Sequence, residues 1–227
     1  MSRQKRFLLQ ESDLPKQWYN IQADMPHKPL PPLNPATKQP VSVDDLAHIF
    51  CKACAQQELD TKNAWIDIPE EVQEKYKYYR ATPLVRAYAL EEALGTPAHI
   101  YFKNESVNPL GSHKVNSALP QCYYCKQEGV TNVTTETGAG QWGAALSYAA
   151  SVYGLSAAVY QVKISMQQKP YRSLVMRAFG AAVTGSPSMS TRAGKDIITR
   201  DPLHQGLAPP SARRWSWPPQ RPTANTH

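Results

Sequence analysis

The pattern of apolar and polar positions changes character near residue 81. From there to about residue 186, short runs rich in β-branched and aromatic residues alternate with longer segments of helical period. These segments predict strands at residues 99–105, 130–136, 155–162 and 181–186, and helices at residues 115–129, 141–154 and 169–180. This alternation is typical of an α/β fold in which helices cover both faces of a parallel sheet.

The two ends of the chain follow other patterns. Prolines are dense over residues 7–40, which predicts an extended arm because proline lacks a backbone donor and clashes with the preceding helical turn. Two helices are expected after the arm, at residues 42–58 and 69–79. We therefore expect three parts: an arm with helices over 1–80, an α/β domain over 81–204, and an irregular tail over 205–227.

Composition and charge exclude several classes of protein. With 227 residues, 41% apolar and 19% charged, the chain can bury one sizeable core and is neither collagen-like nor wholly disordered. No run approaches the roughly 18 apolar residues of a membrane span, and Phe7-Leu8-Leu9 is too short for a signal peptide's core. We therefore expect a cytoplasmic protein that does not associate with a membrane. The net charge is +7, but no basic cluster is interleaved with aromatics, so no nucleic-acid partner is expected.

The four cysteines form two Cys-x-x-Cys pairs, Cys51 with Cys54 and Cys122 with Cys125. Two such pairs can hold zinc, but the gap between them is far longer than the roughly 15–20 residues of compact zinc modules. We expect packed thiols in a reducing compartment, and we predict no metal site.

Two loops that follow predicted strands are candidates for chemistry, because ligands of open parallel sheets bind beyond the carboxyl ends of the strands. In the first loop, GSHKVN, Ser112 is expected to cap the next helix and to leave His113 and Lys114 in its first turn. The positive field of the helix end and partial desolvation favour a neutral amine, the form that makes a Schiff base. The alternative is an ordinary exposed lysine.

The second loop, ETGAGQWG, is rich in small residues between a strand and a helix. Backbone N–H groups left uncovered at a helix N-terminus bind a carboxylate or a phosphate. Glu136 closes the predicted strand and is a candidate acid or base, although a tight turn with a solvated glutamate is the alternative. Both loops are expected on one edge of one sheet. In that layout the lysine amine of the first loop could hold the aldehyde of a cofactor, and the backbone amides of the second loop could hold the carboxylate of an amino acid.

Long stretches of the chain resemble one enzyme family. TPLVRAYALEEALGTPAHIYFKNESVNPLGSHKVNSALPQ and TETGAGQWGAALSYAASVYGL resemble the β chain of tryptophan synthase, a pyridoxal-phosphate enzyme of fold type II. The arm and the stretch QQKPYRSLVMRAFGAAV resemble the branch with an extended N-terminus. Trp142, where the more familiar branch often has histidine, fits that branch. The resemblance runs from about residue 5 to about residue 204.

The resemblance implies roles for individual residues. Lys114 would form the Schiff base with pyridoxal 5'-phosphate, His113 would lie beside the cofactor phosphate, and Asn116 would contact the cofactor. Glu136 would be the catalytic acid and base. The substrate carboxylate would be bound by Thr137, Gly138, Ala139, Gly140 and Gln141.

The implied reaction replaces the hydroxyl of L-serine by indole, giving L-tryptophan and water. Lys114 would remove the α-proton, and Glu136 would assist departure of the hydroxyl and stabilise charge on the indole nitrogen. The implied partners are L-serine, indole, a second copy of the chain and a tryptophan synthase α chain. One alternative is another fold type II reaction, such as threonine or cysteine synthesis. The other is a non-catalytic remnant or interaction module.

The chain departs from the family after residue 204. The text QGLAPPSARRWSWPPQRPTANTH has neither the family's pattern nor any acidic residue, so we expect a frameshift or a lineage-specific tail. The glycine-rich loop for the cofactor phosphate and most of the second domain would then be missing. We accordingly expect an incomplete copy, weakly active or inactive.

Overall fold

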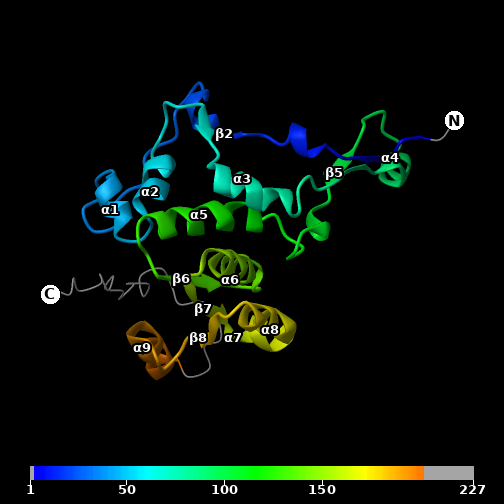
Figure 1. The fold of residues 1–227 in the computed structure, drawn as a ribbon. Helices are drawn as coiled ribbons and strands as arrows, with labels where there is room; N and C mark the ends of the chain where they lie inside the picture. Colours follow the sequence, from blue (N-terminus) through cyan, green and yellow to red (C-terminus); the bar gives the residue numbers. More distant parts are fainter. Residues whose placement is uncertain (1–2, 202–227) are drawn as a thin grey trace.

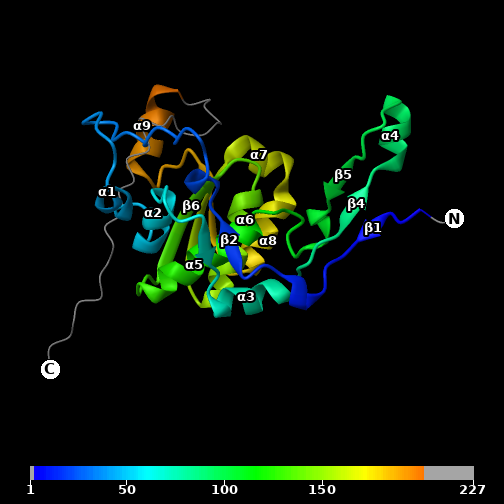
Figure 2. The same cartoon turned by 90° about the horizontal axis from the view of Figure 1, so that it is seen from above.

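Residues 3–201, which this computed structural model describes, contain a three-stranded parallel sheet (Figures 1 and 2). The strands are β6 (Asn132–Thr137), β7 (Ser156–Val162) and β8 (Ala182–Ser186), in that order. The register aligns Thr135 with Val159 and Val159 with Val183. Three of the predicted strands are thus confirmed, with small shifts at their ends. The tail predicted over 205–227 lies outside the described residues.

Two long helices pack on the same face of this sheet. They are α6 (Gln141–Tyr153) and α8 (Pro170–Ala178); α7 (Lys163–Gln168) joins β7 to α8, and α9 (Arg192–Arg200) follows β8. At Gly143 a Cβ would lie 2.7 Å from Met176 Sδ, 2.8 Å from Val159 Cγ1 and 2.9 Å from Thr137 Cγ2. Helix α6 therefore lies directly against β6, β7 and α8, which explains its small residues.

Helix α5 (Val115–Gln127) packs on α6 rather than on a strand, and α3 (Glu70–Lys77) lies beyond α5 (Figure 1). Pro120 stands inside α5 and cannot donate to the carbonyl of Asn116, four residues earlier. The Tyr76 hydroxyl donates to that carbonyl instead. The core is formed by the facing sides of these helices, including Val72, Val115, Leu119, Cys122, Ala145 and Ala149.

The strand expected at 99–105 does not belong to the parallel sheet. Strand β5 (Tyr101–Lys103) pairs antiparallel with β4 (Leu84–Arg86), which pairs antiparallel with β1 (Arg6–Phe7). This second sheet and α4 (Tyr88–Leu94) extend away from the parallel sheet (Figures 1 and 2). The prediction was wrong because the partners of β5 come from the arm and from residues 84–86, and local periodicity does not record them.

The helix expected over 42–58 is interrupted. It consists of α1 (Val43–Ala47) and α2 (Lys52–Glu58), separated by residues 48–51, the last of which, Cys51, is extended with φ −64° and ψ 150°. The arm is mostly extended, as predicted, but its strand β2 (Gln17–Tyr19) pairs with β3 (Trp65–Asp67). None of the helices described by the structure is long and apolar enough to cross a membrane.

Candidate active site

A buried asparagine shapes the loop that leads to the candidate lysine. Asn108 Oδ1 accepts the N–H groups of Leu110 at 3.0 Å and Ser112 at 3.2 Å, while Nδ2 donates to Ser112 O at 2.9 Å. The same amide donates to Glu105 Oε2 at 3.0 Å, and Glu105 Oε1 accepts the Thr82 hydroxyl at 2.8 Å. This network gives the loop one defined path. No local sequence pattern indicates the role of Asn108 or Glu105, because their partners lie in backbone turns and in a distant segment.

Lys114 stands at the head of α5, one residue before the helix begins at Val115. Ser112 Oγ accepts the Lys114 N–H at 3.4 Å, but the helix starts later than predicted, so the expected serine cap is wrong by two residues. Lys114 itself is the N-cap residue, with helical dihedral angles. Its Nζ donates to Gln141 Oε1 at 3.1 Å, whereas His113 is exposed. The lysine side chain therefore points toward the second candidate loop.

Gly140 makes the second loop possible. Its φ of 92° lies in the left-handed region, and a Cβ there would lie 2.9 Å from Arg172 Cβ and 3.0 Å from Gln161 Nε2. Glycine is thus favoured at this position both by the left-handed backbone conformation and by the lack of room for a side chain. As the N-cap of α6, it offers no side-chain acceptor to the first N–H groups of the helix, an arrangement suited to an anion.

The two loops meet, but not by the expected route. They do not share a sheet edge, because β5 and β6 belong to different sheets. Packing of α5 on α6 brings Lys114 and Gln141 together at the two helix starts. Arg172 of α8 lies against both loops: its Nη1 donates to Leu110 O at 3.4 Å, and its Cβ lies close to Gly140. Arg172 was not among the predicted site residues, because its position beside the loops depends on the packing of α8.

Glu136 lies inside β6, opposite Tyr160, and the strand ends one residue later at Thr137. Trp142 Nε1 of α6 donates to Thr135 Oγ1 at 2.8 Å, which places α6 on the face of Thr135 and Thr137. Because strand side chains alternate between faces, Glu136 leaves the sheet on the other face. Its side chain is half-buried. The expectation that Glu136 closes the strand is therefore wrong by one residue.

Two tyrosines of the α3 region hold Asn116, the third residue expected to contact a cofactor. Tyr79 Oη donates to Asn116 Oδ1 at 2.8 Å, and Tyr76 Oη donates to Asn116 O. Burial raises the pKa of Tyr76 to about 12 and raises the pKa of Tyr79 well above its usual range. Both hydroxyls therefore stay protonated near neutral pH and remain donors. The pattern over residues 69–79 predicts a helix but does not indicate this role.

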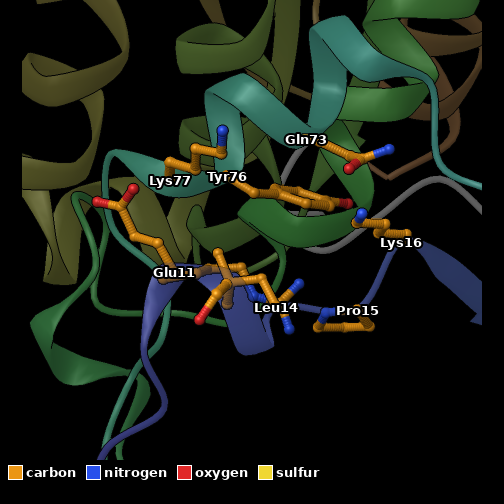
Figure 3. A pocket seen from close by; sticks show the side chains of 9 residues that line it. Glu11, Leu14, Pro15, Lys16, Gln73, Tyr76 and Lys77 are labelled. Atoms are coloured by element: carbon orange, nitrogen blue, oxygen red, sulfur yellow. The ribbon is translucent and has the colours of Figure 1, made fainter.

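A hollow of about 360 Å³ lies between the arm and α3 (Figure 3). It is lined by Glu11, Leu14, Lys16, Gln73, Tyr76, Lys77 and neighbouring residues. None of the residues predicted for the candidate site lines it. The Tyr76 ring borders the hollow, while its hydroxyl faces Asn116. The candidate site is thus defined by the meeting of the two loops and not by this hollow.

The comparison with protein families gives one match over the α/β part of the chain. Residues 76–203 match the family described as pyridoxal-phosphate dependent enzyme. This match covers more than half of the 227 residues and includes both candidate loops.

Several curated relatives share about half of their aligned residues with this chain. It is 52% identical over 198 residues to tryptophan synthase beta chain 2 of Thermotoga maritima, which covers 87% of this chain and 47% of the relative. It is 48% identical over 200 residues to tryptophan synthase beta chain of Thermococcus gammatolerans, covering 88% and 45%. The protein from Aquifex aeolicus, tryptophan synthase beta chain 2, is 50% identical over 202 residues, covering 89% and 46%. The chain spans about half the length of the curated relatives it matches.

Proposed function

Because the chain belongs to the family of pyridoxal-phosphate dependent enzymes, we propose that it carries the lysine half of a site that makes L-tryptophan from L-serine and indole. The observation that carries the proposal is the contact between the two loops, where Lys114 Nζ donates to Gln141 Oε1 at 3.1 Å. The identity of about 50% to tryptophan synthase beta chains supports this choice of reaction. In this proposal the chain acts in the cytoplasm, with a second copy and a tryptophan synthase α chain as its macromolecular partners.

The residues at the meeting of the loops fit pyridoxal 5'-phosphate. Lys114 supplies an amine at a partly buried position, and the head of α6 supplies N–H groups for an anion. Gln161 is fully buried, and its Nε2 beside Gly140 has no hydrogen-bond partner among the described residues, so a donor is available at this loop. His113, Lys114 and Asn116 would hold the cofactor. When bound, the cofactor supplies an electron sink for bond cleavage at the substrate's α-carbon.

The chain's own residues would divide the remaining work. The loop from Thr137 to Gln141 would bind the carboxylate of serine and turn its α C–H bond toward the Lys114 amine. Lys114 would take the α-proton, and its hydrogen bond to Gln141 keeps the amine aimed at the loop. Glu136 would donate a proton to the departing hydroxyl and face the indole nitrogen. That role requires its carboxylate to reach past the end of β6.

The first test asks whether Lys114 is the cofactor lysine. After incubation with pyridoxal 5'-phosphate and reduction with borohydride, mass spectrometry of tryptic peptides should locate the pyridoxyl group on Lys114, because this amine lies where the two loops meet. Lys114→Arg should lose the label, whereas Lys126→Arg, a matched change at the exposed end of the same helix, should keep it. Label on Lys126 or Lys169 in the unmodified chain would refute the assignment.

The second test asks about the reaction and about Glu136. Residues 1–201 can be joined to the C-terminal half of the Thermotoga maritima relative and assayed for tryptophan formation from serine and indole. Glu136→Ala should lower the rate roughly 10²–10⁴-fold, the range for loss of a general acid–base group, and should leave borohydride labelling of Lys114 intact.

The outcomes of this second test separate the rival functions. An unchanged rate in the Glu136→Ala protein would make Glu136 an ordinary strand residue. Faster turnover of O-acetylserine or O-phosphohomoserine than of serine with indole would favour another reaction of the same family. Absence of both turnover and labelling would favour a non-catalytic protein.

A further inference from the structure

The two Cys-x-x-Cys pairs, distant in sequence, come together where α2 meets the end of α5. Glu128 fixes this junction: its Oε2 accepts the Lys52 N–H at 2.8 Å and its Oε1 accepts the Ala53 N–H at 2.9 Å. Cys51 immediately precedes this first turn of α2, and Cys125 lies one turn before Glu128 on α5. The Cys51 thiol lies beside the thiols of both Cys125 and Cys54.

The four sulfur atoms differ in environment. Cys122 is fully buried in the core, and Cys51 is 8% exposed. Cys54 and Cys125 are only partly buried, so solvent reaches the edge of the cluster. Hydrogen bonds from Cys125 and Cys54 lower the pKa of the Cys51 thiol to about 3, whereas the hydrogen bond to Cys51, with burial, raises the pKa of the other two. The cluster therefore places the Cys51 thiol beside two thiols that favour its ionised form.

This arrangement suits thiol exchange better than metal binding. Across residues 3–201, no group of three or more His, Cys, Asp or Glu side chains is placed so that it could hold a metal ion. A thiolate that contacts a second thiol, with access from solvent, has the reactants for disulfide exchange. Cys125 rather than Cys54 is the partner that joins two separate helices.

We propose that Cys51 and Cys125 form a disulfide that links α2 to α5 by exchange with a small-molecule disulfide, such as glutathione disulfide. The Cys51 thiolate attacks one sulfur of the small disulfide, which breaks its S–S bond, forms a mixed disulfide and releases one thiolate. Cys125 gives its proton to that released thiolate and attacks the Cys51 sulfur, which releases the second small thiolate. Two protein sulfurs are oxidised, and one small disulfide is reduced to two thiols.

The disulfide would tie α2, and through it the arm, to the helix that begins beside Lys114. Cys51 and Cys125 lie 74 positions apart, so the link would close a long loop and restrict the unfolded chain. The inference uses only the thiols and is independent of cofactor binding. Its failure would leave the proposed function untouched.

Peptide mapping of the complete 227-residue chain gives a direct test. The chain is incubated with excess glutathione disulfide, its remaining thiols are blocked with N-ethylmaleimide, and it is digested with trypsin without reductant. Trypsin cleaves after Lys52, so Cys51 falls in peptide 39–52, Cys54 in 53–62, and both other cysteines in 115–126. We expect 39–52 linked to 115–126. A link between 39–52 and 53–62, or glutathione adducts without a link, would overturn the proposal.

Single substitutions then identify the sulfur on α5. Cys125→Ser should abolish the link, whereas Cys122→Ala and Cys54→Ser should keep it. The oxidised unmodified chain should melt several degrees higher than the reduced chain, and Cys125→Ser should show no such shift. A link that persists in Cys125→Ser would assign the bond to Cys122 and contradict the pairing. If circular dichroism shows that a variant is unfolded, the peptide map of the unmodified chain still shows whether residues 39–52 and 115–126 are linked.

Discussion

At the scale of single residues, the candidate loops depend on a few positions whose residue type is favoured by the local geometry. Gly140 combines a left-handed backbone with contact to Arg172 and Gln161, so a side chain there would strain the backbone and displace two neighbours. Asn108 satisfies backbone groups on both sides of its turn. Such residues position Lys114 without taking part in any bond-breaking step.

Gly140→Ala should therefore destabilise the chain by about 2–3 kcal/mol, since a strained dihedral and a steric overlap add together. Gly129→Ala is a matched control: its φ is 76°, but nothing lies within 4 Å of the added Cβ, so it should cost only about 1 kcal/mol. Urea unfolding followed by circular dichroism measures both values. Equal losses would show that the space around Gly140 is not tight.

At the scale of elements, short helices are stabilised by groups from distant parts of the chain. Helix α2 has seven residues and an N-cap without a side-chain cap bond, and the carboxylate of Glu128, which directly follows α5, accepts its first two N–H groups instead. In the same way, Tyr76 supplies the donor that Pro120 removes from α5. Packing between helices and hydrogen bonding within them are therefore coupled.

Glu128→Ala should lower the free energy of unfolding by about 1 kcal/mol, the usual value of a helix cap, because two N–H groups of α2 lose their acceptor. Glu128→Gln retains one acceptor oxygen and should lose less. Gln127→Ala, at the neighbouring exposed position, serves as the control and should change little. Thermal and urea unfolding of the four proteins provide the comparison. A Glu128→Ala protein as stable as the control would mean that water replaces the carboxylate without cost.

At the scale of the whole molecule, the candidate site is assembled from two sheets. The loop of Lys114 follows the antiparallel sheet of β1, β4 and β5, and the glycine loop follows β6 of the parallel sheet. The packing of α5 on α6 joins them, and α8 adds Arg172 from a third direction. The arm completes both small antiparallel sheets, since β1 pairs with β4 and β2 pairs with β3. The position of Lys114 therefore depends on residues that are far apart in sequence.

The sequence by itself determined the elements whose signals are local. The periods and closing glycines predict α6 and α8 nearly to their ends, because a helix that buries one face needs apolar residues at helical spacing. The strands β6, β7 and β8 follow from their β-branched and apolar runs. The two candidate loops were also identified from residue types that suit an amine and an anion.

Only the tertiary structure decided which elements are neighbours. It assigned residues 101–103 to an antiparallel sheet, brought Cys51 to Cys125 and placed Arg172 against Gly140. It also turned Glu136 to the face of the sheet opposite α6. The physical reason is that an apolar period records that a face is buried, but not which distant segment buries it. That choice depends on shape and hydrogen-bond pairing across the whole chain, which no local pattern contains.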